Sequence, residues 1–523
     1  MRARGWRTPA AGVLSGALFA FAFPPFEAAV LLPVALVPWI VALAFEESRG
    51  RALLSGILFG LTYWCFSIPW IVFVVTRFGG QGTAMGVVSL VLLAAILAEW
   101  PALVAWGTAA AAPPGAAIRL AAFPVLWTAS EHARSFVYGG FPWNLTANAL
   151  YRHPVWIQSA ALWGAYGVGF LVVAVSSLLA LGIARRRLRP VLVAAALVPV
   201  AGAIGAARLR PSDAGDPVRN APFRVALLQP NVTEESRRSG GDAQAYLRVV
   251  AQAREAAADR PALLVVPESA FPLYWQRSSR LRDDVTAIAA ASGGGVIFND
   301  VEEMPDGRYY NVARLAGPRG LVGPPYRKVH LVPFGEYVPL PKVFFFVRQV
   351  STEIGAFSAA ASPTTLGVDA ARIGVGICYE ILYPSLVRDE VAAPLSAGLL
   401  VTISNDSWYG RAGAQEQHFA GAVLRAVETN RYLLRAAITG ISGIVDARGR
   451  IVGELPPDRP GILRGTARLL HRQTAWTSWG HWLPRLADAA GLAVLLFGLF
   501  RRLGSSRPPR TAAGRPVKTT ETP

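Results

Sequence analysis

Residues 373–380 read Ile-Gly-Val-Gly-Ile-Cys-Tyr-Glu. The β-branched and glycine residues before Cys378 predict a short buried strand that ends at the cysteine. A carboxylate, Glu380, follows closely. In layered α/β proteins, functional side chains usually follow the carboxyl ends of strands. This stretch therefore predicts a strand of an α/β domain with a cysteine at its functional edge.

Two segments nearer the N-terminus repeat this arrangement. The strand-like run Leu263–Val266 leads through a proline into Glu268. The segment Tyr-Arg-Lys-Val-His-Leu-Val-Pro-Phe-Gly-Glu carries Lys328 and Glu336. Taken singly, the glutamate has the pattern of a turn residue, the lysine that of a surface residue, and Cys378 that of a small buried one. Their common place after strand-like runs favours one shared site.

The chemistry of the three side chains is compatible with nucleophilic catalysis. A thiol such as that of Cys378 is a strong nucleophile once its proton is removed. Glu268 is the candidate base, provided that burial raises its pKa. We expect Lys328 to hold a developing oxyanion and to favour the thiolate. Glu336 would orient that lysine, and Glu380 would line the pocket.

The surrounding pattern predicts a layered α/β domain over about 223–470. Short apolar runs alternate there with helical patterns at 242–259 and 414–433. Residues 208–222 are rich in proline, aspartate and glycine, which predicts a linker.

Composition predicts membrane spans in the rest of the chain. Hydrophobic residues make up 53% and charged residues 16% of the 523 residues, an unusually apolar balance. A span needs about 20 apolar residues. We expect about seven spans in 1–207 and one more in 471–502, before a disordered cytoplasmic tail, 503–523. The expected spans lie near 10–24, 27–45, 52–75, 84–111, 116–133, 156–183, 190–206 and 486–500.

The formal net charge of +18 sits largely beside these apolar runs, as in the arginine cluster at 185–189. Positive loops favour the cytoplasmic side, which places 223–470 outside the cytoplasm. Arg208 and Arg210 then lie outside the cytoplasm, which is contrary to the preference of positive residues for the cytoplasmic side. Because no basic stripe with interleaved aromatics appears, we expect no nucleic-acid partner.

The two cysteines and six histidines show no close pairing, so we expect no metal and no cofactor. The ionisable residues near the spans are candidates for function or for structural anchoring, and Trp143 is typical of an interfacial belt. These ionisable residues are Glu99, Glu131, His132 and Arg134, of which the last three are expected at a span end and are the anchoring candidates.

The apolar run Val343–Val347, which contains Phe344–Phe346, has two interpretations. It is either a buried element or a lid that enters the lipid interface, with Gly355 as a hinge. A lid predicts that Phe345→Asp weakens activity on lipid vesicles more than on a detergent-dispersed ester.

These segments resemble the nitrilase, or carbon–nitrogen hydrolase, superfamily. With its apolar N-terminal half, the chain resembles the apolipoprotein N-acyltransferases from about residue 8 to 500. Lys328–Glu336 and Cys378–Glu380 are the most specific matches. The other matches are Phe21–Phe26, Gly140–Trp143, Ser404–Gly410 and Gln417–Phe419, which leads into an expected helix over Glu428–Arg435.

The resemblance implies a four-layer α-β-β-α sandwich beside the helical membrane domain. It also implies that Glu268 is the base, Lys328 the oxyanion stabiliser and Cys378 the nucleophile. The residues that it implies as supports are Glu336, Tyr379, Glu380 and Asn311. Two places depart from the family pattern: 231–241 lacks a tryptophan, and Ala436–Gly440 lacks the usual asparagines.

The reaction that the resemblance implies moves a fatty acyl chain from a phospholipid to Cys378. The α-amino group of an S-diacylglyceryl-cysteine in an apolipoprotein then accepts it. We expect a monomer in the inner membrane of a bacterium, with its catalytic domain on the periplasmic side.

Two other functions are compatible with parts of the pattern. A membrane-bound nitrilase-type amidase would use water as the final acceptor, but a tether needs one span and not many. A transporter or scaffold with an inactive nitrilase domain would not need an intact Glu268, Lys328 and Cys378.

Overall fold

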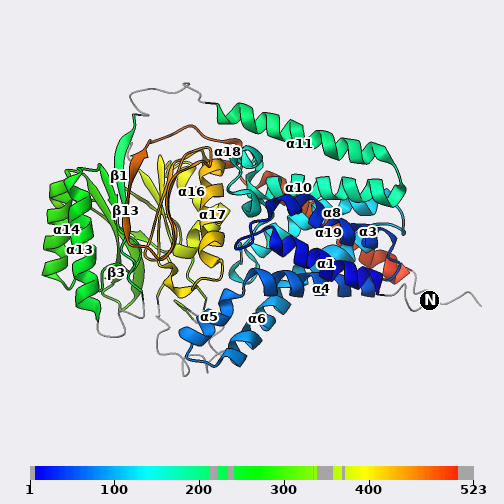
Figure 1. Cartoon of the computed structure of the whole chain (residues 1–523), viewed down its shortest axis with the longest axis horizontal. Coiled ribbons are helices and arrows are strands. Elements are labelled where there is room, and N and C mark those ends of the chain that lie inside the picture. Colours follow the sequence, from blue (N-terminus) through cyan, green and yellow to red (C-terminus); the bar gives the residue numbers. More distant parts are fainter. Residues whose placement is uncertain are drawn as a thin grey trace, which may run out of the picture.

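The structure is a computed structural model that describes residues 6–210, 221–233, 241–333, 335–337, 357–367 and 372–504. Figure 1 shows a helical domain beside a layered domain of sheets and helices. The described residues end at 504 and therefore include only the first two residues of the expected tail, 503–523. They also exclude the Phe344–Phe346 run and Gly355. Most of the expected linker and most of the loop without tryptophan lie outside them too.

The helical domain combines the N-terminal half with two helices near the C-terminal end of the described residues. Its elements are α1 (Arg7–Phe21), η2 (Ala29–Leu31), α2 (Leu32–Ala35), α3 (Val37–Phe45), α4 (Arg49–Ser67), α5 (Trp70–Arg77), α6 (Thr83–Leu97), α7 (Glu99–Ala111), α8 (Ala117–Arg134), η3 (Val137–Gly139), η4 (Thr146–Leu150), α9 (Pro154–Ile157), α10 (Ala160–Arg185), α11 (Leu188–Leu209), α18 (Ala475–Trp479) and α19 (Trp482–Gly504).

Several of these helices are long and apolar enough to cross a bilayer. Within the described residues these stretches are Thr83–Ala111, Ala160–Arg185, Leu188–Leu209 and Trp482–Phe500. The pair α4 and α5 would form a fifth span in spite of its 62° bend. Helix α1 has only 15 residues, and α8 contains Arg119, Glu131 and Arg134. The expected count of eight spans therefore stays a prediction.

Small residues let the helices of this domain pack closely. A Cβ atom added at Gly12 or Gly16 of α1 would come within 2.6 Å of backbone oxygens of α4. On α4, a Cβ atom at Gly56 would lie 2.4 Å from the carbonyl oxygen of Pro101 on α7. Glycines spaced four apart are typical of helix pairs in membranes, where close backbone contact replaces the hydrophobic effect.

The layered domain contains two mixed sheets. The first has the order β13-β1-β2-β3-β4-β5, with β6 paired to β4, and the second has the order β12-β11-β10-β9-β8-β7. Strands β1, β2 and β3 are parallel, as are β8, β9 and β10. The strands are β1 (Phe223–Gln229), β2 (Leu263–Val265), β3 (Gly295–Glu303), β4 (Tyr309–Gly317), β5 (Gly320–Leu321), β6 (Tyr326–Arg327), β7 (Thr365–Leu366), β8 (Ile373–Ile377), β9 (Leu399–Ser404), β10 (Leu433–Ala437), β11 (Ser442–Val445), β12 (Ile451–Leu455) and β13 (Gly461–Ala467).

Helices cover both outer faces of the paired sheets. Helices α13 (Asp242–Ala258) and α14 (Ser279–Ser292) cover the first sheet, and their apolar faces pack on β1, β2 and β3. Helices α16 (Pro384–Val391) and α17 (Ala414–Thr429) cover the second sheet and lie between it and the helical domain (Figure 1). The second sheet is thus the one nearer to the helical domain.

One sequence-based expectation about α17 is wrong. The helical pattern was expected to run to 433, and a helix was expected over Glu428–Arg435, but α17 ends at Thr429. Asn430 adopts a left-handed conformation with φ of 54° and caps the helix, a role that asparagine fills well. The chain then enters β10, so Arg435 lies on a strand.

Candidate active site

Three strand ends bring Glu268, Lys328 and Cys378 together. Glu268 follows β2, Lys328 follows β6, and Cys378 follows β8 as the first residue of η6 (Cys378–Leu382). The Nζ atom of Lys328 lies 3.7 Å from Oε1 of Glu268. Their charges act on the Cys378 thiol in opposite directions, since Glu268 raises its pKa and Lys328 lowers it. All three side chains are buried.

Among the described residues, two groups donate hydrogen bonds to Glu268. Its Oε2 accepts a hydrogen bond from the backbone N–H of Asn405 at 2.9 Å, and its Oε1 accepts one from Nδ2 of Asn311 at 3.0 Å. Burial raises the pKa of Glu268, although Lys328 opposes this effect. A carboxylate with a raised pKa is better matched to proton transfer near neutral pH than an exposed one.

The ammonium group of Lys328 lies closer to Glu336 than to Glu268. Its Nζ donates to Oε1 of Glu336 at 2.9 Å. The same carboxylate accepts from Asn311 at 2.9 Å and from the N–H of Val332 at 2.8 Å. Burial alone would lower the pKa of Lys328, but Glu336 and Glu268 outweigh it and raise the pKa. The side chain is therefore a cation throughout the neutral range.

The thiol of Cys378 is protonated in the resting site. Burial is the largest cause and Glu268 the next, and together they raise the pKa of the thiol to about 12. Lys328 lowers this pKa, as expected of a cation that favours the thiolate, but its effect is smaller than those of burial and Glu268. The backbone of Cys378 is left-handed, with φ of 55°, which is uncommon outside glycine and asparagine. To act as a nucleophile, this thiol would need both a base and firm backbone support.

Glu380 is buried and braces two segments of the site. Its exposed fraction is 0%. One carboxylate oxygen accepts from the N–H groups of Val329 and His330, and the other from Ile377 N–H and the Tyr326 hydroxyl. These bonds join the segment after Lys328 to the strand before Cys378. Burial raises the pKa of Glu380 to about 7, although Lys328 opposes the rise.

A second buried network supports the backbone of Cys378. Nε2 of His418 lies 2.9 Å from the carbonyl oxygen of Cys378. Because a carbonyl only accepts, that nitrogen carries the proton. Asp406 lies 3.1 Å from the other ring nitrogen and accepts from Nη2 of Arg435 at 2.6 Å. Ser404 donates to the same carboxylate at 2.5 Å.

Cys378, Asp406 and His418 place possible metal-ligand atoms within 4.8 Å of one another. The guanidinium of Arg435 already neutralises the carboxylate, and both ring nitrogens of His418 have partners. A cation placed there would meet the positive charge of Arg435. The donor set therefore fits an ion-paired support for the cysteine better than a metal centre.

The Gly140–Trp143 segment of the helical domain borders the site. Hydroxyl groups of Tyr379 and Tyr383 donate to the carbonyl oxygen of Gly140 at 3.2 and 3.0 Å. The Trp143 ring stacks on Tyr379 with centroids 6.1 Å apart, and its exposed fraction is 1%. The expectation of an interfacial position for Trp143 is therefore wrong, because the ring is buried between the two domains.

Models of two protein families match the chain. The model described as apolipoprotein N-acyltransferase N-terminal domain matches residues 15–178, and the carbon-nitrogen hydrolase model matches residues 224–470. An apolipoprotein N-acyltransferase of Geobacter metallireducens is 35% identical over 94% of this chain and 95% of its own length. One from Methylococcus capsulatus is 32% identical over 95% of this chain and 97% of its own length.

The chain belongs to the apolipoprotein N-acyltransferase family. The resemblance inferred from the motifs is thereby confirmed. Among solved structures, an amidase from Nesterenkonia sp. matches with a TM-score of 0.36 and 19% identity, over 48% of this chain and 91% of that chain.

The structure adds three residues to the site that the sequence predicts for this member of the family: Asp406, His418 and Arg435. Asp406 follows the end of β9, so the strand-end argument that selected Cys378 also applies to it. His418 lies inside a helix and Arg435 inside a strand. Both lie in stretches that resemble the family, but neither follows a strand end, so the strand-end argument did not select them.

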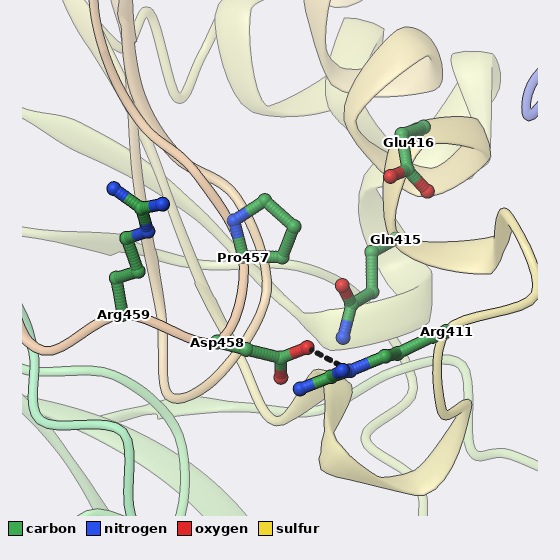
Figure 2. Close-up of a pocket in the computed structure, with 6 residues that line it drawn as sticks. All are labelled: Arg411, Gln415, Glu416, Pro457, Asp458 and Arg459. Carbon is green, nitrogen blue, oxygen red and sulfur yellow. Dashed lines mark hydrogen bonds and ion pairs between the residues drawn. The ribbon is translucent and has the colours of Figure 1, made fainter.

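A polar pocket of about 410 Å³ lies near the start of α17. Figure 2 shows Arg411 and Asp458 paired across it, 2.8 Å apart, with Gln415 beside them. The other lining residues are Glu416, Pro457 and Arg459. Neither the cysteine nor its expected base and cation line this pocket.

Proposed function

We propose that this chain transfers a fatty acyl group from a phospholipid to the α-amino group of S-diacylglyceryl-cysteine in apolipoproteins. The acyl group is carried as a thioester on Cys378. The observation that best supports this proposal is the buried contact of 3.7 Å between Lys328 and Glu268 beside a thiol whose pKa responds to both. Membership of the apolipoprotein N-acyltransferase family supports the choice of substrates.

In the first half-reaction, Glu268 takes the thiol proton as the sulfur of Cys378 attacks the ester carbonyl carbon. A C–S bond forms, and the carbonyl oxygen becomes an oxyanion that the Lys328 ammonium stabilises. The ester C–O bond then breaks. Glu268 returns the proton to the leaving alkoxide, which departs as a lysophospholipid.

In the second half-reaction, the α-amino group attacks the thioester carbonyl. Lys328 again faces the developing oxyanion. The C–S bond breaks, Glu268 accepts a proton from the nitrogen, and that proton returns to the thiolate of Cys378. The products are an amide and the free enzyme, and successive use of one thiol predicts ping-pong kinetics.

The helical domain gives this chemistry a lipid setting. Removal of an acyl chain from the bilayer costs about 0.8 kcal/mol for each CH₂ group exposed, so the site must meet the lipid at the membrane. The exposed arginines at the turn between α10 and α11 lie at the end of the helical domain away from the sheets (Figure 1). This arrangement supports an extracytoplasmic layered domain through the positive-inside rule.

The proposal is tested by mass spectrometry of the full chain after incubation with phospholipid. We expect an acyl mass on the peptide that carries Cys378 and release of an equal amount of lysophospholipid. Cys378→Ala should abolish both. Cys65→Ala is the matched control, because Cys65 is a free, half-buried cysteine on α4, and it should react like the wild type.

The identity of the acyl acceptor distinguishes this proposal from a membrane-bound amidase of the same superfamily, in which water accepts the acyl group. Repeated turnover should require an S-diacylglyceryl-cysteinyl peptide with a free amine, and the N-acetylated peptide should stop the reaction after one acyl group per enzyme. Steady release of free fatty acid without any amine would contradict the proposal and favour water as the acceptor.

A further inference from the structure

Gln417 on α17 makes four hydrogen bonds, all to the helical domain. Its Oε1 accepts from the indole N–H of Trp143 at 2.6 Å and from that of Trp70 at 3.3 Å. Its Nε2 donates to the carbonyl oxygens of Pro24 and Ser67, both at 2.7 Å. The exposed fraction of Gln417 is 1%. Two donors and two acceptors use the full capacity of the amide.

These partners leave only one orientation for the side chain. An indole N–H only donates, so Trp70 and Trp143 must face the amide oxygen. A peptide carbonyl only accepts, so Pro24 and Ser67 must face the NH₂ group. A carboxylate has the same shape as this amide but cannot donate, so it would leave both carbonyls facing a negative charge. Each buried group that loses its hydrogen-bond partner destabilises the contact.

The residue after Gln417 supports the nucleophile. His418 donates from Nε2 to the carbonyl oxygen of Cys378 at 2.9 Å. That carbonyl belongs to the residue with the left-handed backbone, whose conformation must be imposed by its surroundings. A single helical turn therefore contacts the helical domain through one side chain and the nucleophile through the next.

The helical domain also reaches the nucleophile segment directly. Tyr379 donates to the carbonyl oxygen of Gly140, and its ring stacks on Trp143, the stronger partner of Gln417. Arg134 holds the same loop, because its Nη1 donates to the carbonyl oxygens of Phe141 and Trp143. The segment after Cys378 is thus held between α17 and a braced loop of the helical domain.

We propose that Gln417 is a positioning residue, which seats α17 on the helical domain and thereby sets the placement of Cys378 for acyl transfer. The inference rests on the proposed function of Cys378 and adds that the layered domain does not hold its nucleophile correctly by itself. Gln417 touches no reacting atom, so its effect is on the rate of the chemical step and not on lipid binding.

The test compares Gln417→Glu with the wild-type full chain. Single-turnover formation of the thioester is measured at several phospholipid concentrations, and its amplitude counts the competent sites. We expect the maximal rate per competent site to fall on the order of 10- to 100-fold, because small misplacements of reacting groups slow a reaction by such factors. The half-saturating phospholipid concentration should stay within about twofold of the wild type.

A milder variant and a control are measured beside Gln417→Glu. Trp143→Phe keeps the ring on Tyr379 but removes one donor to Gln417, so a smaller loss of the same kind is expected. Gln244→Glu makes the same chemical change at an exposed position on α13 and should leave the rate unchanged. If Gln417→Glu reduces only the number of competent sites, with a wild-type rate in each, the residue is merely structural and the proposal is overturned.

Alkylation of Cys378 by iodoacetamide separates this inference from the proposed function, since it needs no acyl donor. We expect Gln417→Glu to change the alkylation rate per folded molecule at fixed pH several-fold. An unchanged rate overturns the inference. A wild-type enzyme that forms no thioester with phospholipid would instead overturn the proposed function.

Discussion

The Nζ atom of Lys328 lies 2.9 Å from Oε1 of Glu336 but 3.7 Å from Oε1 of Glu268. The lysine is therefore bound more closely by the carboxylate that takes no part in the proposed proton transfer. Glu268 keeps a pKa above its ordinary value in spite of the nearby cation, because burial outweighs the cation. Glu336 thus holds the cation, and Glu268 remains available for proton transfer.

Glu336→Gln should slow thioester formation about 10- to 100-fold. Without the Glu336 charge, Lys328 pairs more closely with Glu268, which lowers the pKa of the base and weakens it. Single-turnover kinetics measure this loss, and the half-saturating phospholipid concentration should not change. Glu255→Gln on α13, at an exposed pair with Arg464, is the matched control. A wild-type rate in Glu336→Gln would contradict the assigned role.

Glu268→Gln should separate the acidity of the thiol from its use in acyl transfer. The Glu268 charge raises the pKa of Cys378, so its removal lowers the midpoint pH of alkylation by iodoacetamide. Acyl transfer should nevertheless fall at least on the order of 100-fold, because the base is lost. A midpoint that stays the same or rises would show that Glu268 does not act on the thiol.

The pH profile of thioester formation should show an acidic limb that belongs to Glu268. Burial raises the pKa of this carboxyl, so the midpoint lies above the ordinary glutamate value of about 4.3. Asn311→Ala removes a hydrogen bond that lowers this pKa, and the midpoint should move to higher pH. A shift to lower pH would contradict the proposed contact.

Asp406→Asn should destabilise the fold at neutral pH by about 3–5 kcal/mol, because Arg435 would lose its buried partner. Burial would raise the pKa of Asp406, but Arg435 and His418 outweigh it and lower the pKa. The charged form thus stabilises the native state above the ordinary aspartate value near pH 3.9, and this contribution falls on further acidification. Denaturation in detergent should therefore show a difference in the free energy of unfolding between wild type and variant, and this difference should become smaller below pH 4.

Gly56→Ala should weaken the helical domain. The added methyl would lie 2.4 Å from the carbonyl oxygen of Pro101 and would push α4 away from α7. Overpacking of this kind costs about 1–3 kcal/mol, which a lower melting temperature in detergent should reveal. Gly50→Ala is the control, because its nearest neighbour would be 3.7 Å away. Equal melting temperatures for the two variants would argue against close packing at Gly56.

Local patterns in the sequence were sufficient to select the main candidates of the site. Glu268, Lys328 and Cys378 each follow a strand-like run, and strand ends are recognisable from a few neighbouring residues. Glu336 could be linked to Lys328 because both lie in one short segment. The layered domain was recognisable for the same reason, since its alternating runs are local features.

The end of α17 shows where local pattern fails. The apolar spacing continues past Thr429, but one left-handed residue, Asn430, stops the helix and sends Arg435 into the second sheet. Asparagine is compatible with a helix interior as well as with a cap, so the sequence does not decide between them. Packing of β10 against β9 decides it here.

The sequence by itself determined which residues are able to do the chemistry, because strand ends and side-chain types are read over a few positions. Only the tertiary structure decided how they are supported: His418 behind Cys378, Asp406 against Arg435, and Gln417 among four groups of the other domain. These contacts join positions far apart in the chain. They form because a buried polar group must find a partner wherever the fold brings one, and no local pattern records which one that is.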